Sequence, residues 1–449
     1  MRRDLLRQFI AKPQRRQFLR AAATAALGAS ASGWLPQLAQ ALATDDTRRR
    51  KCILLWMNGG PSQMDTFDLK PGHANGGDFK EIDTNVPGLR FSEHLPQLAT
   101  QAGQLAILRG LSTKEGDHGR GTHLMRTGHP PGGPVRYPAI GAALSKELGS
   151  DEAELPQYIS IAPYQQFNQA AFSPGFLGPK YAAAVVDARR GAEAAPGGTY
   201  ADLRIENLLP AGEAAARLAG RVGLWQGFEE GFLASHRAPA PIGHEMVYRR
   251  AMRMMRSPAA AAFDLATETP QVRDRYGAGV FGQGCLLARR LVEHGVPFVE
   301  VSLGDFAGPT SNWDTHQNNF ATVKSLSAQL DAAWSSLMLD LDQSGLLDTT
   351  TIIWMGEFGR TPAINAMGGR DHYPNAWTCV LAGGGIRGGQ VFGRTSADGT
   401  MVEDGKVAVG DVLATLCRAL GVDPETKNTS EQGRPLRIAE GTPIREILS

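Results

Sequence analysis

The sequence of 449 residues is poor in cysteine, and none of its cysteines forms a C-x-x-C pair. The four lie far apart, each among apolar neighbours, at Cys52, Cys285, Cys379 and Cys417. We therefore expect buried free thiols, with one long-range disulfide as the alternative.

The chain also lacks a charge imbalance and, beyond residue 43, a long apolar run. Lys and Arg total 46 and Asp and Glu 45, which gives a formal charge of +1. Neutralising nucleic-acid phosphates requires a basic surface, so this balance argues against a nucleic-acid partner. No stretch after residue 43 approaches the roughly 18 apolar residues of a membrane-spanning helix, so we expect no span in the mature protein.

Several nucleotide-binding and catalytic motifs are missing. The sequence has no G-x-S-x-G string, which excludes the nucleophile elbow of an α/β-hydrolase, and no P-loop lysine motif. A G-x-G-x-x-G string does occur at residues 277–282, but the polar residues 271–276 before it do not resemble a strand. A dinucleotide-binding site requires a strand directly before this string, so the string does not predict a dinucleotide-binding site.

The first 43 residues contain an export signal. Arg15 and Arg16 lie in the string QRRQFLR, an Ala-rich apolar segment follows at residues 21–27, and an A-x-A site ends at Ala43. Together these features predict a signal peptide over residues 1–43, and the arginine pair indicates the twin-arginine route; a Sec signal or a membrane anchor is the alternative. We expect the twin-arginine translocase as a partner during export and the periplasm or cell surface as the destination.

Apolar periodicity predicts the fold of residues 44–449, which we expect to form a single domain. Short apolar runs predict buried strands at residues 51–58, 105–109, 158–161, 297–303, 350–355 and 377–381. Helices are predicted at residues 285–294 and 320–341. This alternation predicts an α/β fold with a doubly wound, mostly parallel sheet flanked by helices. The Ala-, Arg- and Glu-rich residues 182–275 predict a mostly helical insertion or cap.

Polar side chains with metal- and anion-binding chemistry gather in the loops after these strands. They are Asp65, His118, Arg120, Asp314, His316, Glu357, Arg360 and His372. Because parallel strands end at the same edge of a sheet, the loops can converge on one site. Carboxylates mixed with imidazoles are ligands of zinc, manganese or a similar divalent ion, and arginines beside them bind an anionic ester. The alternative is structural pairing, for example a salt bridge between Glu357 and Arg360.

Several strings resemble those of the DUF1501 family. They are WMNGGPSQMDTFD at residues 56–68, WDTH at 313–316, GEFGRTP at 356–362, GRDH at 369–372, and RPL with TPI in the tail. The resemblance covers nearly all of the mature chain. DUF1501 proteins are exported, often with twin-arginine signals, and are regarded as similar to the alkaline phosphatase and sulfatase superfamily. The resemblance therefore implies an alkaline phosphatase-like fold and metal-assisted ester hydrolysis.

The superfamily's metal ligands carry over in part. Its paired carboxylate and histidine fall on Asp314 and His316, and its last histidine falls on His372. Its later Asp-His pair falls on Glu357 and Phe358, so the carboxylate is kept and the histidine is lost.

Two further positions differ from the superfamily. The N-terminal aspartate position is Asn58, and Asp65 is the carboxylate seven residues on. The position of the alkaline phosphatase serine nucleophile is His118. This histidine could attack phosphorus, bind metal, or mark the absence of the covalent step.

Two hypotheses of function follow. The first is an exported metal-dependent hydrolase of phosphate or sulfate esters, such as a sulfated or phosphorylated glycan. Its metal is zinc, with manganese, magnesium or calcium as alternatives, and it is held by Asp314, His316 and His372. A second metal would bind Asp65 and Glu357, His118 would take the nucleophile position, and Arg120 or Arg360 would clamp the ester. The second hypothesis is a non-catalytic binding protein of the cell surface or periplasm on the same fold, which the loss of an obvious nucleophile favours.

Overall fold

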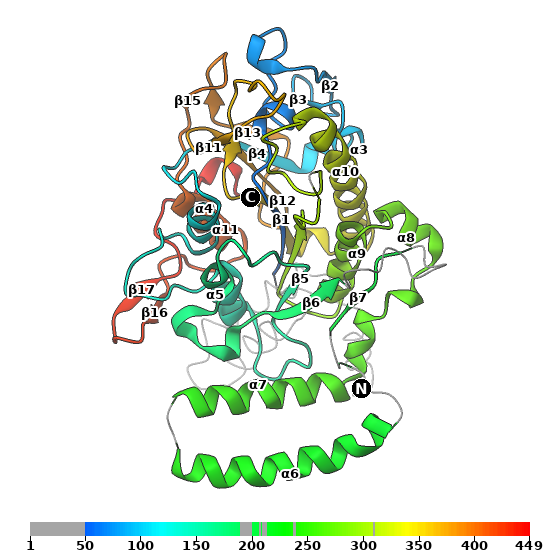
Figure 1. The fold of residues 1–449 in the computed structure, drawn as a ribbon, viewed down its shortest axis with the longest axis vertical. Coiled ribbons are helices and arrows are strands. Elements are labelled where there is room, and N and C mark those ends of the chain that lie inside the picture. The colour runs from blue at the N-terminus through cyan, green and yellow to red at the C-terminus, as the bar shows by residue number, and fades with distance from the viewer. Residues whose placement is uncertain (1–49, 189–199, 206–207, 209–212, 237–238, 309) are drawn as a thin grey trace, which may run out of the picture. The chain divides into compact units, whose positions relative to one another are not determined.

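A nine-stranded sheet organises the chain in the structure, which is a computed structural model (Figure 1). The structure describes residues 50–188, 200–205, 208, 213–236, 239–308 and 310–449. The predicted signal peptide, residues 1–43, lies outside the described residues.

The sheet is mixed but mostly parallel. In spatial order its strands are β13 (Gln390–Phe392), β4 (Leu105–Leu111), β12 (Trp377–Gly383), β9 (Thr350–Gly356), β1 (Lys51–Met57), β8 (Phe298–Leu303), β5 (Tyr158–Ile161), β6 (Ala184–Ala188) and β7 (Leu203–Arg204). Neighbouring strands are parallel except that β12 runs against β4 and β9, and β7 runs against β6. All six predicted strands are present.

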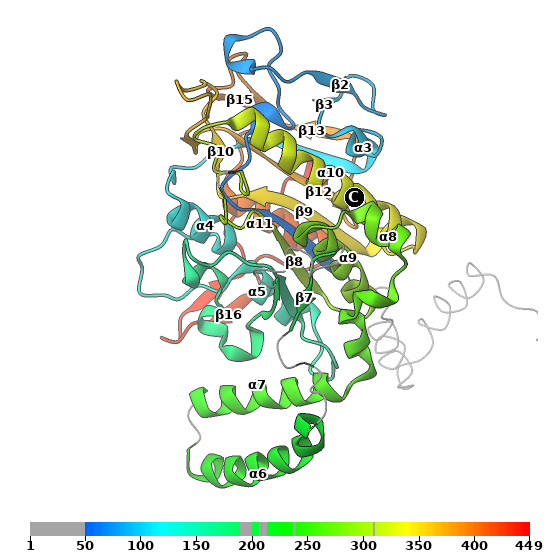
Figure 2. The same ribbon diagram turned by 45° about the vertical axis from the view of Figure 1, so that its right-hand side comes forward.

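Helices cover both faces of the sheet, as Figure 2 shows. One face packs against α3 (Pro96–Ala99), α8 (Pro270–Tyr276), α9 (Val280–Glu293) and α10 (Asn319–Gln343). The other packs against α4 (His118–Thr127), α5 (Ile140–Leu148) and α11 (Val409–Ala419). The central strand β1 is buried over its whole length, because a parallel strand with helices on both faces needs apolar side chains on both. The predicted doubly wound, mostly parallel α/β fold is confirmed.

Residues 182–275 contain β6, β7 and α8 together with two longer helices, α6 (Glu213–Ser235) and α7 (Pro239–Arg256). Both views show α6 and α7 side by side at one end of the molecule (Figures 1 and 2). The role of this segment as an insertion or cap stays a prediction. Because α8 is a helix, no strand precedes the G-x-G-x-x-G string at residues 277–282, as expected.

The four cysteines are all buried and free. Burial raises the pKa of each thiol, so they are inert core side chains. Within the described ranges, no helix combines the length and the apolar character needed to cross a membrane.

Candidate metal centre

Loops from several strands meet at one edge of the sheet. The loop after β1 begins at Asn58, the loop after β8 leads to Asp314, and Glu357 directly follows β9. The loop after β4 leads into α4, which begins at His118. His372 arrives differently: it precedes β12, and because β12 is antiparallel, its amino end lies at the same edge as the carboxyl ends of its neighbours.

Three histidines surround the carboxylate of Asp314. The Nε2 atom of His316 lies 3.1 Å from Asp314 Oδ1, and that of His372 lies 3.2 Å from the same oxygen. The Nε2 atom of His118 lies 3.3 Å from Asp314 Oδ2. The Nε2 atoms of His316 and His372 are 3.0 Å apart. We call these four residues the histidine cluster.

The outer nitrogen of each imidazole is held by an oxygen acceptor. The Nδ1 contacts are His118 with Glu357 Oε1 at 2.8 Å, His316 with Asp371 Oδ1 at 2.7 Å, and His372 with the carbonyl oxygen of Gly116 at 2.7 Å. Carboxylates and carbonyls only accept, so each Nδ1 donates, and the Nε2 of each neutral imidazole is left with its lone pair facing inward. Such outer hydrogen bonds are how proteins orient metal-binding histidines.

With neutral imidazoles, the three Nε2 lone pairs and the Asp314 carboxylate all face inward as acceptors, and Arg360 donates to one oxygen of that carboxylate at 2.7 Å. With all three imidazoles neutral, their lone pairs and the carboxylate repel one another, and either a proton on an imidazole or a bound cation relieves this repulsion. His118 Nε2 is buried and makes no hydrogen bond of acceptable geometry in the described structure, because its 3.3 Å approach to Asp314 satisfies the distance alone. Ligand atoms of His118, Asp314 and His372 all lie within 4.8 Å of one another, so these residues could hold a metal ion.

The pKa shifts point to the same need for positive charge. Burial lowers the pKa of His118, but the carboxylates of Asp314 and Glu357 beside it outweigh this effect and raise that pKa to about 9. Burial raises the pKa of Asp314, but His118, His372 and Arg360 outweigh it and hold the pKa well below its usual range. Imidazoles with one carboxylate match the nitrogen and oxygen ligands of zinc and similar divalent ions.

Two of the predicted metal ligands have other partners. Glu357 contributes one oxygen to His118 Nδ1 and to the backbone N–H of Gly59, 2.8 Å from each, so it orients His118. Asp65 is buried away from the histidines in an ion pair with Arg370 at 2.8 Å, and it also accepts from Asn319 Nδ2 at 2.8 Å. The structure therefore brings together six of the eight predicted residues, Asp314, His118, His316, His372, Glu357 and Arg360, and leaves Asp65 outside.

The predicted ester-binding arginines are both engaged. Arg360 is fully buried and donates to Asp314 Oδ1 at 2.7 Å and to the carbonyl oxygens of Gly59, Gly60 and Arg370. Arg120 forms a bidentate ion pair with Glu115, at 2.6 and 2.7 Å, and its side chain is half exposed. Arg360 is therefore held by Asp314 and the backbone, whereas Arg120 is paired with Glu115 at the surface, and the ester-binding role of both stays a prediction.

The sequence assigned no orienting role to two of the groups that hold the histidines, Asp371 and the carbonyl of Gly116. Asp371 directly precedes His372 in the string GRDH, and that adjacency was a usable signal. The carbonyl of Gly116 carried no signal, because every residue offers the same group.

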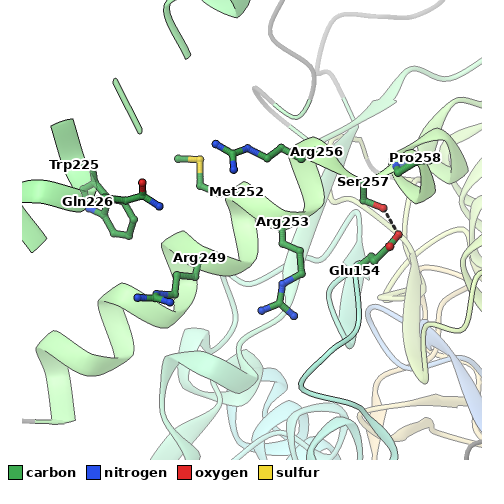
Figure 3. A pocket seen from close by; sticks show the side chains of 9 residues that line it. All are labelled: Glu154, Trp225, Gln226, Arg249, Met252, Arg253, Arg256, Ser257 and Pro258. Carbon is green, nitrogen blue, oxygen red and sulfur yellow. Dashed lines mark hydrogen bonds between the residues drawn. The ribbon is translucent and has the colours of Figure 1, made fainter. Parts of the chain in front are cut away.

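A pocket of about 390 Å³ lies elsewhere, between α6, α7 and the segments that hold Glu154 and Ser257 (Figure 3). Its lining includes Trp225, Met252 and three arginines of α7, but no residue of the histidine cluster. Figure 3 shows these arginine side chains pointing in different directions, so they do not converge on one anion.

Comparisons with known proteins place the chain among distant structural neighbours. A PsFucS1 sulfatase from Pseudoalteromonas sp. is 12% identical, covers 85% of this chain and 70% of its own, and has a TM-score of 0.41. The phosphonate monoester hydrolase SpPMH from Silicibacter pomeroyi is also 12% identical; the match covers 88% of this chain and 76% of that protein, with a TM-score of 0.37. A protein in the alkaline phosphatase superfamily from Vibrio parahaemolyticus is 12% identical; the match covers 84% of this chain and 68% of that protein, with a TM-score of 0.33. No curated protein sequence matches significantly.

The family comparison covers nearly the whole described chain. One family model, described as "Protein of unknown function (DUF1501)", matches residues 49–448. This range includes every motif on which the resemblance rested. The chain therefore belongs to the DUF1501 family.

Proposed function

We propose that the protein is an exported, metal-dependent hydrolase of phosphate or sulfate esters. The observation that carries the proposal is the inward-facing ring of acceptors in the histidine cluster, with each histidine fixed from outside. The ester class comes from the motifs shared with a family regarded as similar to phosphatases and sulfatases. A sulfated or phosphorylated glycan is the proposed substrate, and export follows from the twin-arginine motif.

The residues of the cluster divide into ligands and supports. Asp314, His118, His316 and His372 would hold zinc or a similar divalent ion, which would supply a Lewis acid that stabilises negative charge on the ester and lowers the pKa of a water molecule. Glu357, Asp371 and the Gly116 carbonyl fix the imidazole planes. Arg360 fixes one oxygen of Asp314 and leaves the other facing His118.

His118 fits the role of ligand better than that of nucleophile. Its Nδ1 is bonded to Glu357 and its Nε2 faces Asp314, so neither nitrogen is directed toward open solvent. Among the described residues, no serine or threonine side chain is hydrogen-bonded to the histidine cluster. We infer that water, rather than a side chain, attacks the ester.

Metal content and ester hydrolysis test this proposal together. We expect near-stoichiometric divalent metal in the folded protein, and its loss in the double variant Asp314→Ala, His372→Ala. The matched control is Asp342→Ala with His236→Ala, which removes an exposed carboxylate and imidazole outside the cluster. Hydrolysis of p-nitrophenyl phosphate or sulfate should disappear with a chelator and return with metal.

The outcomes separate the two hypotheses. A folded wild type that takes up no metal contradicts the metal centre and the hydrolase. A protein that binds metal at the cluster but hydrolyses neither ester supports the non-catalytic binding protein instead.

A further inference from the structure

Three aromatic side chains form a wall beside the histidine cluster. Tyr164 and Phe167 follow β5, and Phe306 follows the neighbouring parallel strand β8. The rings of Tyr164 and Phe306 have centroids 4.5 Å apart and an interplanar angle of 27°, and Phe167 meets each of them edge-on at 5.0 and 4.8 Å. We call these three residues the aromatic wall.

The aromatic wall contacts a residue of the cluster directly. The ring of Phe167 stacks on the imidazole of His118, with centroids 4.3 Å apart and an interplanar angle of 3°. The loop is fixed to α4 beside it, because Asn168 Nδ2 donates to the carbonyl of Gly119 at 3.0 Å. A Cβ at Gly119 would come within 2.8 Å of the Phe167 carbonyl oxygen, so glycine permits this close approach.

Core packing does not explain the aromatic wall. All three rings are only half-buried, and none belongs to either hydrophobic core cluster. Phe306 also has a φ of 56°, a conformation that costs a bulky side chain on the order of 1 kcal/mol. Strained bulky residues persist mainly where function requires their placement.

We propose that the aromatic wall binds the alcohol half of the ester and selects alcohols that contain a ring with an apolar face. This inference rests on the proposed hydrolase function. The charged phosphate or sulfate belongs at the histidine cluster, and the wall beside it carries no formal charge, so a neutral group fits there. A phenyl ring, or the apolar face of a sugar ring, stacks on aromatic side chains, whereas a linear alkyl chain makes less contact.

Binding of hydrolysis-resistant phosphonates tests the proposal without catalysis. In the metal-loaded full chain we expect phenylphosphonate to bind about three- to tenfold more tightly than n-butylphosphonate, measured by calorimetry. The ratio should fall below about twofold in Phe306→Gly and in Tyr164→Leu. Phe306→Gly also removes the backbone strain, so its thermal stability should be kept while its selectivity is lost.

A matched control removes an aromatic side chain that stacks on a histidine outside the cluster. Tyr137 stacks on His129 with centroids 3.6 Å apart, outside the cluster, so Tyr137→Ala should keep the wild-type ratio. Turnover of phenyl phosphate and glucose 1-phosphate, each relative to n-butyl phosphate, then identifies an aryl ester or a sugar ester as the preferred substrate.

The outcomes distinguish this inference from the proposed function. If inorganic phosphate, inorganic sulfate and both phosphonates all fail to bind the metal-loaded protein, the proposed function is contradicted. If both phosphonates bind with equal affinity, or if the ratio survives in Phe306→Gly and Tyr164→Leu, the aromatic wall is not the selective subsite, although the proposed function stands.

Discussion

At the scale of single residues, the metal centre depends on side chains that would not touch the metal. Glu357 is the clearest example, since its buried carboxylate serves both His118 and the loop after β1. Its negative charge favours the imidazole orientation in which Nε2 faces Asp314.

Glu357→Gln should therefore weaken metal binding without unfolding the protein. The amide has the same shape and one oxygen, but it lacks the charge that supports His118. We expect metal affinity to fall about 10- to 100-fold, measured by competition with a chelating dye. The control is Glu115→Gln, which removes the partner of Arg120 instead. Equal affinities for Glu357→Gln and the wild type would contradict the orienting role.

His129, which lies outside the metal centre, should make the stability of the protein depend on pH. Burial lowers the pKa of His129, His123 adds to this effect, and Glu440 opposes it. In the unfolded chain His129 has its ordinary pKa of about 6.5, so as the pH falls the unfolded state takes up the proton before the folded state does. Stability is therefore lost as the pH falls through about 6.5. The wild type should lose more unfolding free energy than His129→Gln between pH 8 and pH 5 in urea titrations. Parallel pH profiles of the two proteins would refute this.

At the scale of elements, the site depends on how closely the loops after β1 and β8 approach each other. The N–H of Trp313 donates to the carbonyl of Asn58 at 2.9 Å, which joins the two loops next to Asp314. Gly59 lies at this contact with a φ of +106°, and a Cβ there would collide with the backbone of Trp313 and Asp314. Glycine is therefore required both by conformation and by space.

Gly59→Ala should separate these loops and weaken the metal centre. We expect a loss of more than about 1 kcal/mol in unfolding free energy, together with reduced metal affinity. Gly72→Ala is a matched control, because Gly72 also has a positive φ, +80°, but its Cβ would meet nothing within 4 Å. It should lose stability through strain alone and keep its metal. Equal metal affinity in both variants would show that the close approach does not matter.

At the scale of the whole molecule, a buried ion pair joins the helix that carries His118 to the centre of the sheet. Arg126 of α4 lies 2.5 Å from Glu300 of β8, and both side chains are almost completely buried. Glu300 also accepts hydrogen bonds from Tyr158 at 2.7 Å and Ser160 at 2.5 Å. The pair and its hydrogen bonds thus connect α4, β5 and β8.

Arg126→Met should destabilise the molecule by about 3–5 kcal/mol, because it leaves the Glu300 carboxylate buried without its cation. Chemical unfolding measures this loss. Arg136→Met removes an arginine from an exposed pair with Glu431 and should cost less than about 1 kcal/mol. A loss of less than about 1 kcal/mol in Arg126→Met would contradict a stabilising role of this buried ion pair.

The sequence alone determined the strands, the long helices and the edge of the sheet at which the site lies. Apolar periodicity is a local property, and parallel strands end at one edge whatever their order. Asp314, His316, His372, His118 and Glu357 were therefore predicted as neighbours. Their order across the sheet, including the reversed strand β12 that brings His372 to this edge, came only from the tertiary structure.

The tertiary structure also decided the separate roles of residues of the same type. Asp65 and Asp314 are both carboxylates after strands, yet Asp65 pairs with Arg370, 305 residues away, while Asp314 faces three imidazoles. Arg360 donates to the carbonyl oxygen of Gly60, and Arg120 pairs with the carboxylate of Glu115. The aromatic wall joins two loops more than a hundred residues apart. Such choices depend on burial and on partners distant in sequence, and local patterns contain neither.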